Sequence, residues 1–312
     1  MGASATRISA ADFLTPPELR ERRLAAEGSG RIGGVRLALT GGPTSIRLAR
    51  CYQQVPLRVL PPFQFGFGQP GLLYLLNPTA GLMDGDAQLI EIDAGTGTRS
   101  VIVGQSATRI HPCLRGFSTQ QWHIDVAAGA VLAVLPGPTI PFRGCHYYQR
   151  VEISLAADAG LVWGDIWLAG RYARDEPAEQ FQFGSLIQDL TVRRDGCLVF
   201  RDRFCWQGPW NPATAAWHFG TGPACGSLFI TGPVREQELF HDASTAWALF
   251  PTAWGDTCVR WSGVSESVTA CVVKNALHLG ASLAGNPRDR PWLYPGNDLG
   301  PNHWFSLRYE PV

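Results

Sequence analysis

The chain has few charged residues and no excess of either sign. Charged side chains make up 17% of its 312 residues, and 26 basic residues stand against 26 acidic ones. A balanced charge creates no overall field that would draw the chain to nucleic acid or to an anionic membrane. Hydrophobic residues make up 45%, which is enough for a large core. We therefore expect a folded protein that binds neither nucleic acid nor membrane.

The sequence also lacks a long hydrophobic run and any paired cysteine motif. No stretch approaches the roughly 18–20 apolar residues that span a bilayer, and the N-terminus has no apolar segment of the signal-peptide type. The eight cysteines are scattered, without a CxxC pair, which favours reduced and mostly buried thiols over a disulfide framework. These features predict a cytoplasmic protein.

Common catalytic signatures are missing too. The sequence contains no GxxxxGK[ST], no GxSxG and no HExxH, and its glycine-rich stretch GFGQPG at 66–71 lacks the lysine that a phosphate-binding loop needs. We therefore expect a protein that is not an enzyme. The alternative is a carbohydrate-active β-solenoid enzyme or a binding module, because the chain has eleven tryptophans, including Trp206, Trp210 and Trp217 in one aromatic loop.

Short apolar–polar alternation with glycine-rich turns is abundant. A unit of about thirty residues occurs three times between Tyr74 and Gly170, with turns that begin at Ile92 (IDAGTGT), Ile124 (IDVAAGA) and Ile153 (ISLAADA). Each unit predicts a strand, a tight turn and a strand, as in a hairpin. Such units must stack to bury their apolar faces. We expect an all-β fold with a few short helices, built of two stacked sheet layers of β-solenoid character, and an ordinary β-sandwich fits equally well.

The chain is predicted to form one domain over residues 1–312. Residues 1–33 are expected to form an N-terminal extension with a short helix within 16–26, where prolines precede strong helix formers. The further expectations are loops and edge strands over Leu198–Pro223, a helix over Val234–Phe250 and an irregular tail over 285–312.

Carboxylates are the most suggestive polar residues. Asp84 and Asp86 flank a glycine, and a turn explains this pair as well as a site does, because Asp side chains bond nearby backbone amides. Glu91 and Asp93 lie two residues apart on an expected strand. They could share one face of a site or one solvated face of the sheet.

Asp165 is unusual because it lies inside the apolar run LVWGDIWLAG. An unpaired charge would be costly to bury there, so we expect a partner such as Arg171 or a water-filled passage. Separately, His111 and Cys113 would point to one face of a strand and could suit nickel. A turn histidine beside a buried thiol is the favoured explanation of that pair.

Four segments follow one another in the order and spacing of a family signature. They are YLLNPTAGLMDGD (74–86), QSATRIH (105–111), LPGPTIPFRGCHYYQR (135–150) and DIWLAGRYARDE (165–176). Together they resemble the UreD family of urease accessory proteins, also called UreH. The resemblance implies a mainly β protein that binds apo-urease and, with UreF and the GTPase UreG, delivers nickel through an internal water-filled tunnel. It implies no tightly bound cofactor, only nickel in transit.

The resemblance also places residues on that path. Asp84 and Asp86 fall in a turn of the family, Thr108 in the QSAT segment, and Asp165, Arg171 and Glu176 in the last signature. The candidates for the nickel path are Asp84, Asp86, Glu91, Asp93, Thr108, Asp165, Arg171 and Glu176, with His111 and Cys113 as candidate metal ligands. The chain departs from the family at Ala133, Val134 and Gly137, and in KNALHLGASLAGNPRDRPW, which matches the family's C-terminal helical signature poorly.

Overall fold

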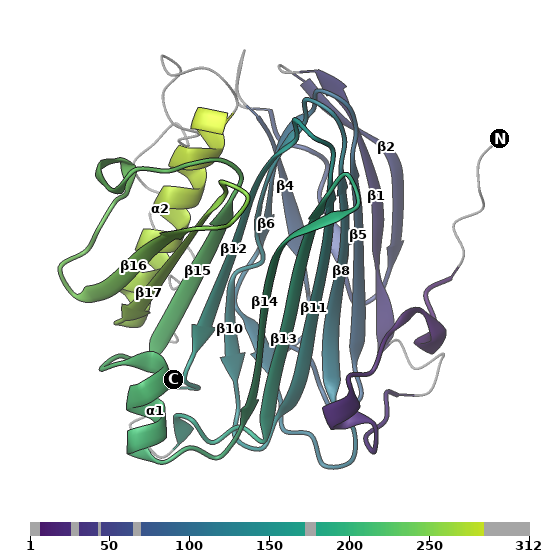
Figure 1. The fold of residues 1–312 in the computed structure, drawn as a ribbon. Coiled ribbons are helices and arrows are strands. Elements are labelled where there is room, and N and C mark those ends of the chain that lie inside the picture. The colour runs from purple at the N-terminus through teal and green to yellow at the C-terminus, as the bar shows by residue number, and fades with distance from the viewer. Residues whose placement is uncertain (1–6, 26–30, 43–44, 65–69, 172–178, 284–312) are drawn as a thin grey trace, which may run out of the picture.

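The computed structural model describes residues 7–25, 31–42, 45–64, 70–171 and 179–283. Most of the described residues lie in two β-sheets that face each other, with one long helix against the outer side of the second sheet (Figure 1). The mainly β class with two sheet layers is confirmed. The solenoid character stays a prediction. In the described part of the chain no helix is long and apolar enough to cross a membrane.

The first sheet has seven strands in the order β14-β13-β11-β8-β5-β1-β2. Its strands are β1 (Ile32–Gly42), β2 (Ser45–Gln54), β5 (Ala87–Ala94), β8 (Ser118–Val126), β11 (His146–Leu155), β13 (Ser185–Arg194) and β14 (Cys197–Gln207). The five strands from β1 to β13 pair in parallel, and β2 and β14 close the two edges in antiparallel pairs.

The second sheet follows the order β16-β17-β15-β12-β9-β6-β4-β3, with β7 and β10 off this path. Its strands are β3 (Arg58–Val59), β4 (Gly71–Leu76), β6 (Arg99–Gly104), β7 (Thr108–Ile110), β9 (Val131–Leu135), β10 (Pro138–Pro141), β12 (Gly160–Leu168), β15 (Ala224–Ile230), β16 (Thr245–Pro251) and β17 (Thr257–Gly263). Strands β4, β6, β9 and β12 pair in parallel, and β12, β15, β17 and β16 pair antiparallel.

The three sequence repeats cross from one sheet to the other. Each predicted strand–turn–strand unit is present, as β5 and β6, β8 and β9, and β11 and β12, but its two strands lie in different sheets and do not pair as a hairpin. The turns instead bond to the turn of the next unit, as when Gly97 N donates to Ala128 O at 3.0 Å. Gly97 and Gly129 have φ of 67° and 64°, which glycine adopts readily. The repeats therefore bury their apolar faces between the sheets.

Strand β12 is buried on both faces, which explains why its sequence is apolar except at Asp165. One face meets the first sheet and the other meets helix α2 (Ser265–Leu283). The contact with α2 is close because β12 and β15 present glycines to it: a Cβ on Gly226 would lie 2.6 Å from Cγ2 of Val272. The segment that matched the family's C-terminal helical signature poorly is thus helical as far as Leu283.

The helix predicted over Val234–Phe250 is wrong. That segment holds a 3-10 turn at Glu236–Glu238 and then strand β16. Ser244 N and Oγ both donate to Asp242 Oδ1, which forms a tight turn just before the strand. Within β16, Trp247 and Leu249 pack on the α2 side while alternate residues are exposed, so the period is that of a strand.

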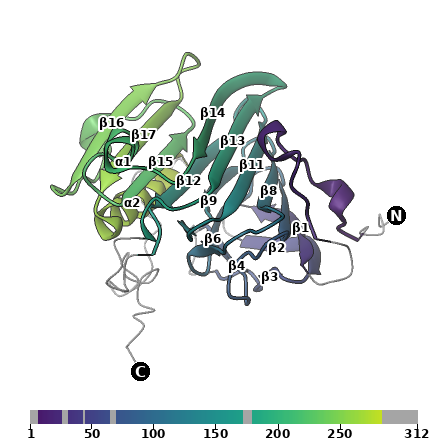
Figure 2. The same cartoon turned by 90° about the horizontal axis from the view of Figure 1, so that it is seen from below.

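The other helix expectations are met in part. The short helix expected within 16–26 is present only as a 3-10 turn at Pro17–Leu19, and another 3-10 turn precedes it at Ala10–Asp12. The Leu198–Pro223 stretch contains edge strand β14, as expected, and also helix α1 (Pro212–Phe219), which Asn211 caps by accepting from Thr214 N at 2.9 Å. Figure 2 shows α1 on the same side as β15. The 285–312 tail lies outside the described residues.

Candidate functional site

Asp165 lies in the middle of β12 and faces the first sheet, with 3% of its surface exposed. Its Oδ2 accepts from Trp163 Nε1 at 2.5 Å and from Gln188 Nε2 at 2.7 Å, and its Oδ1 accepts from Gln149 Nε2 at 3.3 Å. All three donors are neutral. Burial raises the pKa of Asp165 from 3.8 to about 6, although these hydrogen bonds favour the ionised form. The carboxylate is therefore held by dipoles rather than by a counter-ion.

Four buried glutamines form a row across the first sheet opposite Asp165. They lie in register on β5, β8, β11 and β13, and each is at most 5% exposed: Gln88, Gln120, Gln149 and Gln188. Gln120 Nε2 donates to Gln88 Oε1 at 3.0 Å, and Gln188 Nε2 donates to Gln149 Oε1 at 2.8 Å. We call these four residues the glutamine row. With Asp165 they form one polar layer inside an apolar sandwich.

Aromatic side chains line both sides of this polar layer. On one side Trp122 and Trp163 pack edge to face, with ring centroids 5.4 Å apart, and each donates its indole N–H into the layer, to Gln120 and Asp165 respectively. On the other side Tyr147 and Trp167 pack at 6.0 Å. The Tyr147 hydroxyl and Trp167 Nε1 are buried and have no hydrogen-bond partner. Leaving buried polar atoms without a partner is costly, so these two groups are unusual in a packed interior.

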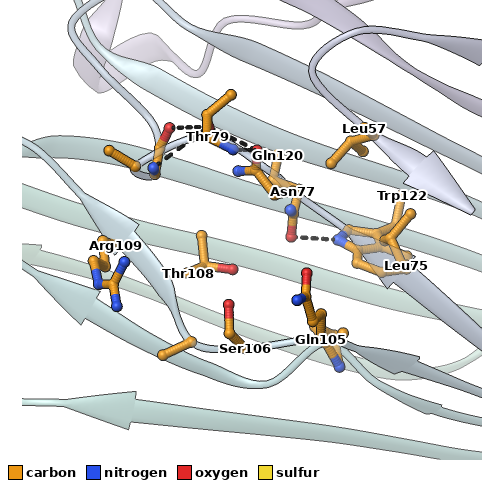
Figure 3. A pocket seen from close by; sticks show the side chains of 15 residues that line it. Leu57, Leu75, Asn77, Thr79, Gln105, Ser106, Thr108, Arg109, Gln120 and Trp122 are labelled. Carbon is orange, nitrogen blue, oxygen red and sulfur yellow. Dashed lines mark hydrogen bonds between the residues drawn. The ribbon is translucent and has the colours of Figure 1, made fainter. Parts of the chain in front are cut away.

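A small cavity of about 40 Å³ opens onto the polar layer at the ends of β4, β6 and β9 (Figure 3). Polar side chains line much of it, including Asn77, Thr79, Gln105, Ser106 and Thr108. Its inner wall is Gln120 and Trp122, joined by the 3.0 Å bond from the indole to the amide oxygen. Thr108 thus lies on the wall of a cavity that reaches the glutamine row. The lining does not include Asp165.

Asp84 shapes a surface loop. Its carboxylate accepts from the backbone N–H groups of Leu114, Arg115 and Gly116 at 3.0, 3.1 and 2.7 Å. Burial works to raise the pKa of Asp84, but these three bonds lower it below its ordinary value. Asp84 therefore joins its own turn to the 114–116 loop, about thirty residues further along the chain, rather than bonding amides of its own turn.

Asp86 has a similar structural environment. Its Oδ2 accepts from Met83 N at 2.7 Å, and its Oδ1 pairs with Arg31 Nε at 2.7 Å. One bond closes the turn before β5 and the other ties that turn to the start of β1. Asp86 thus bonds a nearby backbone amide within the turn, as the turn explanation expects.

Glu91 and Asp93 lie on the outer face of the first sheet, away from the polar layer. Glu91 of β5 pairs with Arg36 of the adjacent β1 at 2.6 Å, and Asp93 of β5 reaches across β1 to Arg50 of β2 at 2.5 Å. Both carboxylates are partly exposed. The pair therefore shares a solvated face, which was the alternative explanation.

Arg171 forms a two-point ion pair with Glu179, at 2.6 and 2.8 Å, and its guanidinium lies over the ring of Phe142. This contact holds the two sides of the 172–178 segment together. Asp165 takes its hydrogen bonds from other residues, so the structure brings Arg171 to Glu179 rather than to Asp165. Glu176 lies outside the described residues.

His111 and Cys113 lie close in sequence but make separate contacts. His111 Nε2 lies 3.1 Å from Ala80 O, and the Cys113 thiol donates to the carbonyls of His111 and His146 at 3.5 and 3.6 Å. Burial raises the pKa of the Cys113 thiol. Within the described ranges no group of three or more His, Cys, Asp or Glu side chains could hold a metal ion.

The glutamine row is the part of the site that the sequence analysis missed. The sequence does contain a signal for it. Each glutamine begins the pattern Gln-x-apolar-x-apolar, in QLIEI, QQWHI, QRVEI and QDLTV. The pattern occurs once in each of the three repeats and once more at Gln188, after the last repeat. The sequence pattern alone does not show that these side chains meet. The strand register shows that the four side chains are neighbours across one sheet.

The chain is thus a mainly β protein with two facing sheets. Its candidate site is a buried polar layer around one carboxylate. A family model described as UreD urease accessory protein matches residues 31–284, well over half of the chain. The chain belongs to the UreD family. The resemblance inferred from four short segments is therefore confirmed.

Individual relatives carry the same description. The chain is 33% identical over 168 residues to urease accessory protein UreD 2 of Streptomyces griseus, covering 53% of this chain and 56% of that protein. It is 40% identical over 157 residues to UreD of Deinococcus radiodurans, covering 50% and 55%. It thus spans little more than half the length of these two relatives. With UreD of Sorangium cellulosum it is 28% identical over 298 residues, covering 89% and 90%.

Proposed function

We propose that this chain acts in urease maturation as a non-catalytic scaffold and nickel conduit that binds apo-urease together with UreF and UreG. Membership of a family described as urease accessory proteins supports the maturation role. Nickel is the cargo in this proposal and passes through without a tight resident site. A conduit needs polar groups that lower the cost of desolvation and yet release the ion.

One observation carries the conduit proposal: Asp165 is a buried carboxylate whose three hydrogen-bond donors are all neutral. Burying such a charge is costly unless something offsets it, and a divalent cation beside it would do so. Gln149 and Gln188 each carry an amide oxygen as well as an NH₂ group. Rotating either amide by half a turn would present that oxygen to a cation next to the carboxylate.

The glutamine row extends the proposed path away from Asp165. Gln120 links the row to the polar cavity, so nickel would pass between the cavity wall with Thr108 and the carboxylate through a layer of amides. Amide and carboxylate oxygens bind nickel less tightly than imidazole or thiolate do, which favours release. We place Asp165 and Thr108 on this path, and nickel ligation by His111 and Cys113 stays a prediction.

The test is urease activation in cells that hold the urease subunits and the other accessory genes. Four versions of this gene are compared: the natural gene, a deletion, Asp165→Asn and Asp125→Asn. The first substitution keeps the shape of the side chain and removes its charge; the second does the same at an exposed carboxylate on the outer face of β8. Urease activity, nickel per urease and recovery of the complex with apo-urease are measured.

We expect the deletion to abolish activation. We expect Asp165→Asn to leave the complex intact and yield nickel-poor urease, while Asp125→Asn behaves like the natural gene. Full activation without the gene would refute the accessory role. Full nickel loading of urease with Asp165→Asn would refute the conduit through Asp165, and only the scaffold role would remain.

A further inference from the structure

One edge of the sandwich is closed by side chains rather than by backbone pairing. Strand β14 ends the first sheet there, opposite β12, β15 and β17 of the second sheet (Figure 2). Phe200 stacks on Phe229 with ring centroids 4.7 Å apart, and Phe204 packs edge to face on Trp167 at 5.1 Å. Between these two aromatic contacts β14 presents a carboxylate, Asp202.

Asp202 pairs with Arg260 of β17, with Oδ2 and Nη2 2.7 Å apart. Arg260 is in register with Asp165, because Asp165 lies opposite Ser227 of β15 and Ser227 lies opposite Arg260. Residues opposite each other in an antiparallel pair point to the same face. The neighbouring Gly226 faces α2, so Ser227 and Arg260 face the first sheet, as Asp165 does. The ion pair therefore continues the polar layer to the edge of the molecule.

Solvent reaches this edge. Cys225 and Ser227 point between the sheets and are nonetheless partly exposed. The Arg260 side chain is 51% exposed and that of Asp202 is 22% exposed, whereas Asp165 behind them is 3% exposed. Asp202 is near enough to Asp165 and to Cys225 for its charge to disfavour ionisation of both. Exposure thus falls from the ion pair inward to Asp165.

A second ion pair between the sheets differs in kind. Arg194 pairs with Asp256 at 2.7 Å, but Asp256 is 2% exposed and also accepts from Gly232 N at 2.9 Å. Breaking that pair would leave a buried charge, which is costly. The half-exposed Arg260 can exchange Asp202 for water at small cost. Of these two ion pairs, only Arg260–Asp202 can be broken at small energetic cost.

We propose that the Arg260–Asp202 pair closes a cation port at this edge, with Asp202 as the outer ligand for a divalent cation that passes to or from Asp165. The guanidinium competes with the cation for the Asp202 carboxylate, and its fixed charge repels cations while it stays in place. The port opens when Arg260 swings into solvent. This assignment rests on the proposed function for the identity of the cargo, but the port itself can be tested without urease.

Cys225 reports on the port because it points between the sheets and the charges of both Arg260 and Asp202 act on its thiol. The exposed and partly exposed thiols at Cys51, Cys197 and Cys205 are first replaced by serine, so that they do not mask it. Cys225 is then modified with a cationic reagent, methanethiosulfonate ethylammonium, and separately with the anionic ethylsulfonate reagent. The thiol reacts slowly because burial raises its pKa to about 12, so rates are compared between variants.

Arg260→Met keeps much of the bulk of the side chain and removes the charge. We expect the cationic reagent to modify Cys225 about two- to fivefold faster, the factor that corresponds to loss of an exposed ion pair. Asp202→Asn leaves the positive charge of Arg260 without its partner. We therefore expect the anionic reagent, rather than the cationic one, to modify Cys225 faster in this variant. The control is Arg201→Met, because Arg201 is the neighbour of Asp202 and pairs with Asp189 on the outer face.

Opposite charge preferences in the two variants, with no change in the control, support the port. Equal acceleration of both reagents in both variants would mean that the pair only holds the edge together, and would overturn the proposal. So would rates that match the control. Circular dichroism of each variant checks that the fold is unchanged.

Nickel loading of urease separates this inference from the proposed function. If Asp202→Asn and Asp165→Asn both yield nickel-poor urease, the port lies on the nickel path. If only Asp165→Asn does so, the conduit stands and this port is overturned. If neither does, the proposed conduit fails, and the port fails with it as a route for nickel.

Discussion

Replacing Asp165 by asparagine should change how the stability of the protein depends on pH. Burial raises the pKa of Asp165 from 3.8 to about 6 in the folded state, whereas the unfolded chain returns the carboxyl to water and to its ordinary value. The folded state therefore binds the proton more tightly than the unfolded state does. It follows that the free energy of unfolding falls as pH rises between these two values.

The size of the effect follows from the two pKa values. Their difference corresponds to about 3 kcal/mol in all, at 1.36 kcal/mol per pKa unit. The cost of ionisation is small below pH of about 4, grows through the window up to pH of about 6 and is then nearly constant. Of the total, about 1.4 kcal/mol develops between pH 5 and pH 7.5, a range in which unfolding is convenient to measure.

Asparagine does not titrate, so the free energy of unfolding of the variant lacks this contribution from ionisation at position 165. Urea unfolding of both proteins at pH 5 and at pH 7.5 gives the difference in free energy of unfolding at each pH, and groups common to both proteins cancel. We expect the variant to gain about 1–1.5 kcal/mol relative to the natural protein at the higher pH. Asp125→Asn, on the outer face, should show no such gain. A difference that is the same at both pH values would refute the account of Asp165.

Three further substitutions test the structure around the site. Gln188→Leu removes the donor 2.7 Å from the Asp165 carboxylate, so urea unfolding should show a loss of about 1–3 kcal/mol at pH 7.5 and a smaller loss at pH 5. Asp84→Ala leaves three backbone N–H groups without their acceptor, and we expect about 1–3 kcal/mol of destabilisation and faster proteolysis at 114–116. Gly226→Ala would place a Cβ 2.6 Å from α2 and should cost about 1–3 kcal/mol in thermal unfolding, whereas Gly42→Ala, with open space around it, should cost less than about 1 kcal/mol.

Some properties of this protein could be predicted from its sequence because they depend on short stretches of chain. Apolar–polar alternation and glycine turns predicted a mainly β fold of two layers, since a strand with one buried face has a period of two residues. Asp165 stood out because a charge inside an apolar run is costly wherever the run lies. The family could be inferred because its signatures are contiguous segments.

Other properties depend on which residues meet across the fold. The three-and-four spacing over Val234–Phe250 suggested a helix, but packing of β16 on β17 made it a strand. The repeats looked like hairpins, and only the topology showed that each one crosses between sheets. Helix α2 was missed although its buried residues Val268, Val272 and Ala276 recur every four residues; what the sequence does not show is that Gly164 and Gly226 let it pack closely on the sheet.

The candidate site divides in the same way. Asp165 and the four glutamines are visible in the sequence as separate residues, but parallel register brings the glutamines together from positions 29 to 39 residues apart. Asp202 and Arg260, 58 residues apart, become partners because β14, the edge strand of the first sheet, lies opposite β17, the second strand from the edge of the other sheet. The sequence by itself determined the strands of the three repeats and marked Asp165 as a carboxylate inside an apolar run. Tertiary structure decided what surrounds that carboxylate, because side-chain neighbours across a sheet are set by strand pairing rather than by distance along the chain.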